Sequence, residues 1–390
     1  MTDVMVVAGS RTAIGDYGGA FKDVPPTKLG AIAIREALTR AKVDPASVGH
    51  VVMGSVIHGE ARDMYLSRVA AVDAGIPVGT PALTVNRLCG SGLQAIVSAA
   101  QHIMLGDTNI AVAGGAESMS RAAYMLPSGR WGQRMGDAPV IDAMTAALHD
   151  PFGHGHMGVT AENIAAKYGF TREQQDQYSV ESHKRAARAI EAGYFKSQIV
   201  PVELKTKKGV EQFTTDEHVR ADASMENLAK LKAVFKKDGT VTAANASAIN
   251  DAAAAVVLMD AKAAKNYKPM ARLVAYAHAG VEPQVMGLGP IPAVKRVFEK
   301  AGLKPADMDV IESNEAFAVQ AMAVTKDLGL DPAKVNPNGG AVALGHPIGA
   351  TGCILTVKAL YELERTGKRY ALGTMCIGGG QGIAAIFERV

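Results

Sequence analysis

The chain repeats itself at an offset of 260 residues, and this repeat limits the folds open to it more than any other feature. The paired segments are 35–48 with 295–308, 90–92 with 350–352, and 110–112 with 370–372. One register holds through three separate elements, and Pro45 falls on Pro305. The repeat therefore predicts that one β/α unit is used twice.

Each copy of the unit reads as an amphipathic helix, a small loop and an apolar strand. The strands are expected at 51–53 in the first copy and at 310–311 in the second. This alternation favours an α/β fold in which each half holds a mixed, largely parallel sheet with helices packed on it.

A long insertion separates the two copies, from about Ser118 to Ser247, and it is rich in polar and charged residues. One helix is clear, from about Thr171 to Ala192, and it opens with a capping box formed by Thr171 and Gln174. An excursion of this size typically forms a lid or a binding or assembly surface. The expected parts are an N-terminal half (1–118 plus 249–266), a loop domain (119–248) and a C-terminal half (267–390).

The composition is that of a soluble α/β enzyme, with 390 residues of which 48% are hydrophobic and 20% charged. A formal net charge of +3 gives no reason to expect nucleic-acid binding. The sequence shows no signal peptide, and no apolar run approaches the roughly 18 residues of a membrane span. Three cysteines without C-x-x-C spacing indicate a reducing compartment. The expected location is the cytoplasm.

Basic residues gather in the middle third of the chain, at 183–188, 205–208 and 230–237. They fit either solvated helix and hairpin faces or an anion site for a phosphorylated ligand.

Two cysteines lie far apart, and glycines follow each of them at the end of an apolar run. Cys89 stands directly before Gly90, and Cys376 stands shortly before Gly378. Glycine allows a tight turn and lets a ligand approach the main chain. An apolar helix expected from about Ser91 to Met104 places Cys89 at a helix N-terminus, where the dipole and free N–H groups favour the thiolate. Cys89 is therefore predicted to be a nucleophile rather than an inert core residue.

The stretch after Cys89 also matches G-x-G-x-x-A, the fingerprint of a dinucleotide site. It lies far from the N-terminal βαβ unit where that motif usually stands, and no acidic residue ends a second strand about twenty residues later. A nicotinamide oxidoreductase therefore remains only a weak alternative.

Two further polar residues stand at the ends of predicted elements. His346 lies between Gly345 and Pro347 on a rigid turn, and the repeat aligns it with Asn86, close to Cys89. A histidine held in this way suits acid–base chemistry, although a satisfied polar residue is the alternative. Asn314 follows the second apolar strand, where it either caps the next helix or holds a water against a substrate oxygen.

Histidines 149, 154 and 156 raise the question of a zinc site. No cysteine and no H-E-x-x-H motif accompanies them, so no metal site is expected.

Four motifs together resemble those of the thiolase family, and the similarity covers essentially the whole chain. They are Asn86-Arg87-Leu88-Cys89-Gly90-Ser91-Gly92, Asn314-Glu315-Ala316-Phe317, Gly345-His346-Pro347-Ile348-Gly349 and Cys376-Ile377-Gly378-Gly379-Gly380. The resemblance implies two duplicated α/β/α/β/α half-units, an inserted loop domain and a homotetramer, a dimer of dimers. It also implies acyl-CoA and CoA as substrates and products, with no tightly bound cofactor.

The resemblance further implies the role of each site residue. Cys89 would carry the acyl group as a thioester, and Cys376 would move the proton to and from the α-carbon of the second acyl-CoA. His346, with a water held by Asn314, would form one oxyanion hole, and the N–H groups of Cys89 and Gly378 the other. The residues implied for coenzyme A and the acyl chain are His156, Met157, Arg220 (adenine end), Phe235, Ser247, Phe317, Leu148 and Met286 (the last two for the acyl pocket).

The sequence departs from the family pattern at Ala248 and Ala252, where glycines are usual, and Cys353 has no implied role. The stretches 62–66, 86–89 and 148–152 look most like bacterial β-ketothiolases of polyhydroxyalkanoate supply, which accept acyl chains longer than acetyl. The alternatives are a thiolase restricted to acetoacetyl-CoA, a decarboxylating ketoacyl synthase in which Cys376 has no role, and a non-catalytic acyl-CoA-binding protein.

Overall fold

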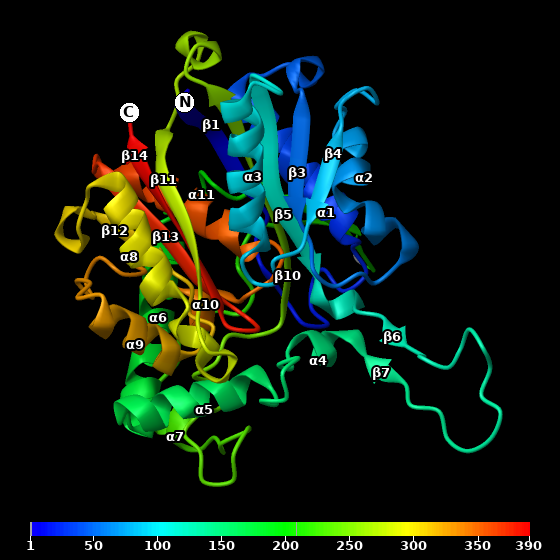
Figure 1. The fold of residues 1–390 in the computed structure, drawn as a ribbon, viewed down its shortest axis with the longest axis vertical. Helices are drawn as coiled ribbons and strands as arrows, with labels where there is room; N and C mark the ends of the chain where they lie inside the picture. Colours follow the sequence, from blue (N-terminus) through cyan, green and yellow to red (C-terminus); the bar gives the residue numbers. More distant parts are fainter. Residues whose placement is uncertain (1, 208) are drawn as a thin grey trace.

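The computed structural model describes residues 2–207 and 209–390. Two α/β halves lie side by side, with helices between them and on both outer faces (Figure 1). The strands run in the order β12-β13-β14-β11-β1-β10-β5-β3-β4, and the short β2 pairs with β10. Their bounds are β12 Val310–Ser313, β13 Tyr370–Ile377, β14 Gln381–Arg389, β11 Ala271–Gly280, β1 Val4–Arg11, β10 Asn250–Asp260, β5 Ile110–Ser118, β3 His50–Gly54, β4 Ala82–Val85 and β2 Gly15–Asp16.

Each half repeats the same strand order, which confirms the duplication read from the sequence. The N-terminal half runs β1-β10-β5-β3 and the C-terminal half β11-β14-β13-β12. Both are mixed as expected, but the expectation that they are largely parallel is wrong. Only β5-β3 and β13-β12 are parallel in these runs, and the remaining neighbours are antiparallel. The two half-sheets also join at a short antiparallel contact between β1 and β11, which pairs Met5 with Arg272 and Val6 with Ala271.

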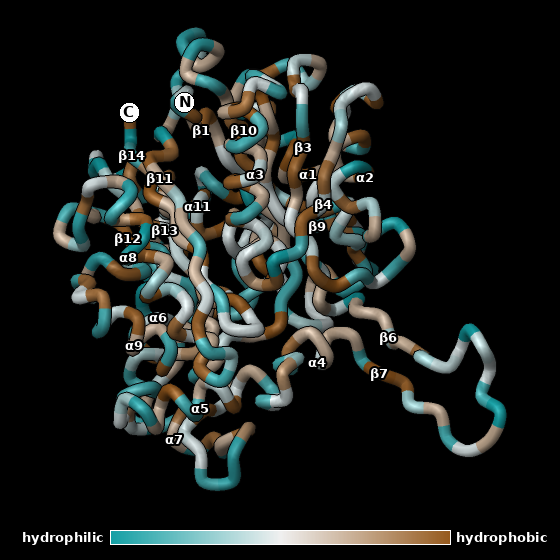
Figure 2. The backbone as a smooth tube through the Cα atoms, in the orientation of Figure 1, coloured by the Kyte–Doolittle hydropathy of each residue, from teal (hydrophilic) through white to brown (hydrophobic). Residues whose placement is uncertain are grey.

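The helices of the two halves form three layers around these sheets. Helix α1 packs with α2 on the outer face of the N-terminal half-sheet, α8 covers the other outer face, and α3 and α11 pack against each other in the centre. Their bounds are α1 Pro26–Ala41, α2 Leu66–Asp73, α3 Ser91–Leu105, α8 Pro290–Ala301, α9 Ala318–Asp327, α10 Ala341–Leu344 and α11 Thr351–Thr366. Hydrophobic segments follow the strands, and much of the outer loop backbone is hydrophilic (Figure 2).

The centre of the molecule corrects one expectation. Segment Leu88–Leu105, which includes α3, is long and apolar enough to cross a membrane, with a mean hydropathy of 1.2. Its apolar side chains instead pack between the two half-sheets, together with those of α11. The high hydropathy is therefore that of a core helix surrounded by protein.

The insertion forms a projecting arm and a group of helices at one end of the molecule (Figure 1). Its hairpin packs instead on the N-terminal half, where Val202 and Phe213 join the apolar cluster of α1. Its elements are β6 Tyr124–Met125, β7 Ile141–Asp142, α4 Ala143–Ala147, α5 Met157–Tyr168, α6 Arg172–Glu191, β8 Val202–Thr206, β9 Gly209–Phe213 and α7 Met225–Ala229. The capping box of Thr171 and Gln174 starts α6 as predicted. The three-part division of the chain stays a prediction.

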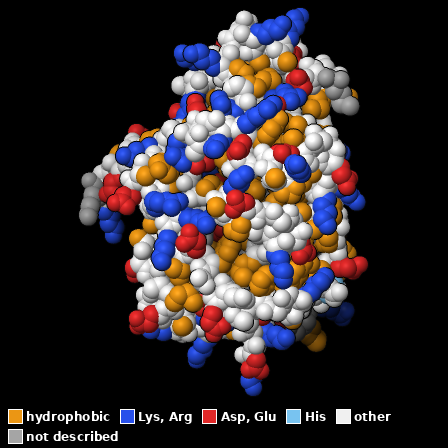
Figure 3. All heavy atoms as spheres, turned by 90° about the vertical axis from the view of Figure 1, so that its left-hand side faces the viewer, with side chains coloured by type: hydrophobic (Ala, Val, Ile, Leu, Met, Phe, Trp, Pro, Cys, Tyr) orange, Lys and Arg blue, Asp and Glu red, His pale blue; other side chains and the backbone are white. Residues whose placement is uncertain are grey.

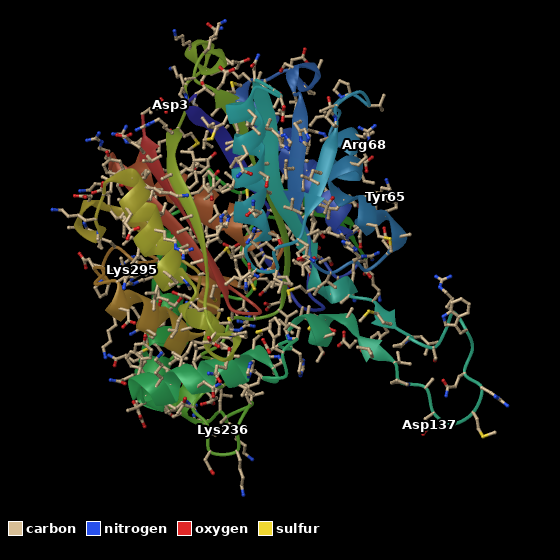
Figure 4. All side chains as sticks on the ribbon, viewed as in Figure 1. Asp3, Tyr65, Arg68, Asp137, Lys236 and Lys295 are labelled. Atoms are coloured by element: carbon tan, nitrogen blue, oxygen red, sulfur yellow. The ribbon has the colours of Figure 1, made fainter. Side chains whose placement is uncertain are left out.

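Two labelled side chains show how far the insertion reaches from the core. Asp137 lies on the arm, and Lys236 lies on a loop at the end of the molecule beyond α5 (Figure 4). The face shown in Figure 3 carries cationic and anionic side chains interspersed, in keeping with the small net charge.

Candidate active site

A cavity of about 490 Å³ lies where the two halves meet the insertion, and most of the predicted site residues line it. The predicted residues in its wall are Cys89, Leu148, His156, Met157, Phe235, Ser247, Met286, Phe317, His346, Cys376 and Gly378. They come from segments spread over nearly 300 residues of sequence, so only the tertiary fold brings them together.

Cys89 stands in a constrained turn between β4 and α3. Leu88, directly before it, has a positive φ of 44°. The Ser91 hydroxyl holds this turn, because Oγ accepts from the Arg87 N–H at 2.8 Å and donates to the Leu88 carbonyl at 2.6 Å. A left-handed residue other than glycine is costly and tends to occur where function requires it. The turn presents the half-buried Cys89 to the cavity.

The G-x-G-x-x-A stretch after Cys89 does not bind a dinucleotide in this fold. A methyl group placed on Gly92 would lie 2.7 Å from the backbone nitrogen of Cys353. The backbone of α11 therefore occupies the space that a pyrophosphate would need. These glycines serve the close packing of two helices.

Burial controls the thiol of Cys89 more than the helix N-terminus does. Burial raises the pKa of Cys89 to about 11, although the N–H groups of Gly378 and of Cys89 itself act to lower it, and the charge of Glu117 raises it further. The expectation that the helix terminus leaves a thiolate is therefore wrong for the free enzyme. Cys89 is a neutral thiol near pH 7 and needs a base to become a nucleophile.

His346 lines the same cavity and is the candidate for that base. Its Nδ1 lies 2.7 Å from Thr351 Oγ1, and this hydroxyl already donates to the Pro347 carbonyl at 2.9 Å. Thr351 must therefore accept from His346, which puts the proton on Nδ1 and leaves Nε2 as the unprotonated nitrogen. Burial lowers the pKa of His346 to about 4, so the imidazole is neutral and can accept a proton.

Asn314 lies against the same imidazole. Its Nδ2 is 3.4 Å from His346 Nε2, and its Oδ1 is buried without a hydrogen-bond partner among the described residues. Asn314 directly follows β12, and its backbone N–H donates to Thr374 of β13. A buried amide oxygen without a partner fits the predicted role of holding a water.

Cys376 lies near the end of β13, between β12 and β14, and has no solvent exposure. Burial, followed by the charge of Cys89, raises the pKa of Cys376 well above the ordinary range. Both Cys89 and Cys376 line the same cavity. Gly378, two residues later, also lines the cavity.

Aromatic side chains from the insertion and the C-terminal half form one wall of the cavity. The rings of His156 and Phe235 stack, with centroids 4.6 Å apart, and Phe317 meets Phe235 edge-on at 6.3 Å. His156 Nδ1 caps α5 by accepting from the Gly158 N–H at 3.0 Å. The Ser247 hydroxyl donates to the Ala316 carbonyl at 3.1 Å. Leu148, Met157 and Met286 complete an apolar lining.

Arg220 is the predicted coenzyme residue that the structure leaves outside the cavity wall. Its side chain is 56% exposed, and its guanidinium donates to Asp16 at 3.3 Å. Asp16 also pairs with His218 at 2.7 Å, and both of these residues line the cavity. The neighbours of Arg220 therefore reach the cavity although Arg220 does not.

The histidines of the insertion do not assemble into a metal site. His149 and His156 meet edge-on at 5.2 Å, and His149 Nδ1 bonds the Thr145 carbonyl. No group of three or more His, Cys, Asp or Glu side chains suited to a metal lies within residues 2–207 and 209–390.

The unusual alanines and the third cysteine also have clear places. Ala248 lines the cavity, so its methyl group takes up space there. Ala252 is fully buried in β10, opposite Glu117 of β5. Cys353 is fully buried on α11, which agrees with the expectation of a small packed residue.

Sequence reasoning missed three polar residues around His346. Thr351 orients the imidazole, the Asn250 side chain accepts from the His346 N–H at 2.9 Å, and Glu117 accepts from the Gly349 N–H at 2.9 Å. The repeat offers a signal for Glu117, because the offset of 260 aligns it with Ile377, next to Cys376.

Comparisons with known proteins show the family of the chain. Residues 4–262 match the family model of the thiolase N-terminal domain and residues 267–389 that of the C-terminal domain. The chain is 65% identical over 391 residues to the beta-ketothiolase BktB of Cupriavidus necator, covering 100% of this chain and 99% of that protein. It is 49% identical over 393 residues to an acetyl-CoA acetyltransferase of the same organism, covering 100% of both.

Solved structures agree with the sequence comparison. The human mitochondrial 3-ketoacyl-CoA thiolase superposes with a TM-score of 0.98 at 45% identity, covering 100% of this chain and 99% of that one. The same human enzyme in complex with CoA gives a TM-score of 0.97 at 45% identity, covering 100% and 98%. Fold and family together define an acyltransferase, and its two halves both line the candidate active site. The chain belongs to the thiolase family, as its motifs indicated, and CoA is the family's substrate rather than a resident cofactor.

Proposed function

We propose that this chain acts as a β-ketothiolase, condensing an acyl-CoA with acetyl-CoA to a 3-ketoacyl-CoA and free CoA, and running the reverse thiolysis. The observation that carries this proposal is one cavity holding Cys89, Cys376 and His346. A decarboxylating ketoacyl synthase needs one reactive cysteine, whereas this cavity holds a second. The second sulfur supports proton transfer at a carbon atom.

The first half-reaction loads Cys89. His346 Nε2 takes the proton of the Cys89 thiol, and the thiolate attacks the carbonyl carbon of the acyl-CoA. The backbone N–H groups of Cys89 and Gly378 stabilise the oxyanion of the tetrahedral intermediate. The C–S bond to CoA then breaks, and the departing sulfur takes the proton of Cys376. The products are acyl-Cys89, CoA, a protonated His346 and a Cys376 thiolate.

The second half-reaction makes the new carbon–carbon bond. The Cys376 thiolate removes a proton from the α-carbon of acetyl-CoA, and protonated His346 with the water of Asn314 stabilises the enolate oxygen. The enolate carbon attacks the acyl-Cys89 thioester. Cys89 leaves and recovers its proton from His346, so that all three groups return to their starting states. The neutral His346 of the free enzyme fits this cycle, because Nε2 acts first as a base and then as a donor.

Coenzyme A is proposed to lie along the aromatic wall, with its pantetheine chain near His156, Met157, Phe235, Ser247 and Phe317. The apolar lining and the geometry of these rings support this placement. The phosphates and adenine would extend out toward Arg220, whose exposed guanidinium lies beyond the cavity. An acyl-CoA-dependent enzyme with a soluble fold is proposed to work in the cytoplasm.

The acyl site is proposed to accept chains longer than acetyl, with Leu148 and Met286 in its wall. The identity of 65% to a β-ketothiolase against 49% to an acetyl-CoA acetyltransferase of the same organism supports this. Steady-state thiolysis of 3-ketovaleryl-CoA beside acetoacetyl-CoA tests it. The kcat/KM values for the two substrates are expected to lie within about tenfold of each other. Activity confined to the four-carbon substrate contradicts the proposal that the acyl site accepts longer chains.

Assembly into a homotetramer, a dimer of dimers, is proposed from two surfaces. Strand β4 is one of the two end strands of the described sheet, and an edge strand is a common pairing site. The arm at 122–142 exposes large apolar side chains, including Trp131 at 88% and Met135 at 86%. Exposed apolar patches of this kind mark contacts between proteins.

The decisive experiment separates the two half-reactions. Cys376→Ser is expected to lose condensation and thiolysis while Cys89 still becomes acetylated from acetyl-CoA, as seen by intact mass. Cys89→Ser is expected to lose both the acetyl adduct and turnover. Unchanged turnover in Cys376→Ser contradicts the proposed role of the second sulfur, and absence of any adduct in the native chain favours a non-catalytic binding protein.

A further inference from the structure

Glu117 is a fully buried carboxyl close to the catalytic segment 345–349, and the reaction described above does not use it. Its oxygens accept from three backbone N–H groups. Oε2 accepts from Gly349 at 2.9 Å and from Val56 at 3.1 Å, and Oε1 accepts from Ile57 at 3.2 Å. One side chain of β5 therefore fixes the loop after β3 and the loop before α11 at the same point.

The segment that carries His346 is thus held at both ends by the other half of the molecule. At its start, the His346 N–H donates to Asn250 Oδ1 at 2.9 Å, and at its end the Gly349 N–H donates to Glu117. Asn250 and Glu117 lie on the neighbouring strands β10 and β5. The C-terminal half supplies the imidazole, and the N-terminal half fixes its position.

The internal repeat shows that this contact has a counterpart. At the offset of 260, Gly349 corresponds to Cys89, and Glu117 corresponds to Ile377. Ile377 lies against the start of α3, because a methyl group on Gly90 would lie 2.6 Å from its side chain. A methyl group on Gly349 would likewise lie 2.6 Å from Glu117 Oε2. The turn of the first copy thus carries the reactive sulfur of Cys89. The equivalent turn of the second copy has Gly349, which contacts the carboxyl of Glu117.

We propose that Glu117 is a positioning residue for acyl transfer, because its carboxyl fixes Gly349 and through it the imidazole of His346. The inference rests on the role proposed above for His346. The three donors account for all the hydrogen bonds of the carboxyl in the described chain, so it does not bridge to a side chain whose loss could explain an effect.

The carboxyl also acts on the site electrostatically. Burial raises the pKa of Glu117 to about 8 against the lowering effect of its three N–H donors, and the charge of Asp63 raises it further. When Glu117 is ionised, its charge raises the pKa of Cys89. Because the pKa of Glu117 is about 8, this effect on Cys89 grows as the pH rises through that value.

Glu117→Gln, assayed above pH 8 where the carboxyl is ionised, is the direct test, because the amide keeps the volume but replaces one acceptor oxygen by a donor. An NH₂ group must then face either the Ile57 N–H or the N–H pair of Gly349 and Val56. The expected result in thiolysis of acetoacetyl-CoA is a fall in kcat of about tenfold to a hundredfold, because a small misplacement of a catalytic group has effects of this size. The KM for CoA is expected to change by less than about threefold, because Glu117 does not line the cavity.

Glu312→Gln is the matched control for the loss of a buried carboxyl. Glu312 has no solvent exposure and pairs with Lys358 at 2.7 Å, without a hydrogen bond to segment 345–349. The Glu312→Gln variant is expected to have a lower melting temperature, while its kcat per folded enzyme stays within about threefold of the native value. A fall in kcat that tracks the melting temperature in both variants overturns the proposal, and so does a kcat of Glu117→Gln within about twofold of the native value.

Gly349→Ala changes the other partner of the contact between Gly349 and Glu117. It is the second test if Glu117→Gln does not fold. The new methyl group displaces the carboxyl while leaving it in the chain, so the same loss of kcat with an unchanged KM is expected. Native kcat in a folded Gly349→Ala overturns the proposal. Cys89→Ser distinguishes failure of the proposed function from failure of the role of Glu117. Turnover in Cys89→Ser refutes the proposed role of Cys89. An inactive Cys89→Ser together with a fully active Glu117→Gln refutes only the role of Glu117.

Discussion

Gly92 of α3 contacts the start of α11, and its counterpart Gly352 of α11 contacts the start of α3. A methyl group on Gly92 would lie 2.7 Å from the backbone nitrogen of Cys353, and one on Gly352 would overlap the backbone nitrogen of Leu93. These two glycines are 260 residues apart, as are the two residues they meet. The pseudo-twofold axis of the duplication therefore passes between the N-termini of the two central helices, close to Cys89 and His346.

Gly352→Ala is expected to destabilise the chain by about 1–3 kcal/mol, because neither helix backbone can move away without disturbing a half-sheet. Urea unfolding followed by circular dichroism measures this. Gly373→Ala is the matched control, since Gly373 is buried in β13 and a methyl group there meets nothing within 4 Å. Equal stability of the two variants contradicts a close helix crossing.

Alkylation of Cys89 by iodoacetamide is expected to rise about tenfold per pH unit between about pH 7 and pH 10, because only the thiolate reacts. The rate increases with pH because the pKa of Cys89 is raised. Burial raises the pKa of Cys89 to about 11, so the thiolate fraction is small near neutrality and grows as the pH rises toward that value. Peptide mass spectrometry in the Cys376→Ser background isolates Cys89, and a rate that levels off below about pH 8 indicates a preformed thiolate instead.

Asp216→Ala is expected to lower the free energy of unfolding by about 3–5 kcal/mol, because it leaves the Arg11 guanidinium buried without its partner. Both side chains have no solvent exposure and are joined by hydrogen bonds of 2.7 and 2.9 Å. Arg62→Ala is the control, since the pair of Arg62 and Asp73 is exposed and 3.5 Å apart. That change is expected to cost at most about 0.5 kcal/mol by the same denaturant titration.

Trp131→Asp combined with Met135→Asp is expected to halve the particle mass measured by light scattering, because charge on the arm prevents burial of its apolar side chains between dimers. Leu105→Asp provides the control, since Leu105 is 78% exposed at the end of α3 and away from the arm. A native particle mass in the arm variant shows that the arm does not form the proposed tetramer contact. A smaller particle in the Leu105→Asp control shows that the effect is not specific to the arm.

Much of the fold follows from local patterns. The register of the repeat requires no knowledge of contacts, and it correctly aligned β3 with β12 and β5 with β13. The capping box before α6 was equally local, because Thr171 and Gln174 bond within one turn. The join between β1 and β11 had no such signal, because two residue pairs between distant strands leave no periodic trace in the sequence.

The order of residues in the chain was enough to identify the family and the duplication and to predict the reactive groups, because motifs and repeats are properties of residue order. Only the tertiary structure decided how those groups behave. The helix N-terminus predicted a thiolate at Cys89, but burial, which depends on every surrounding element, raises its pKa to about 11. The tautomer of His346 likewise depends on Thr351, and the positions of Gly349 and His346 depend on Glu117 and Asn250 from the other half. Desolvation and long-range hydrogen bonds exist only once the two copies pack together.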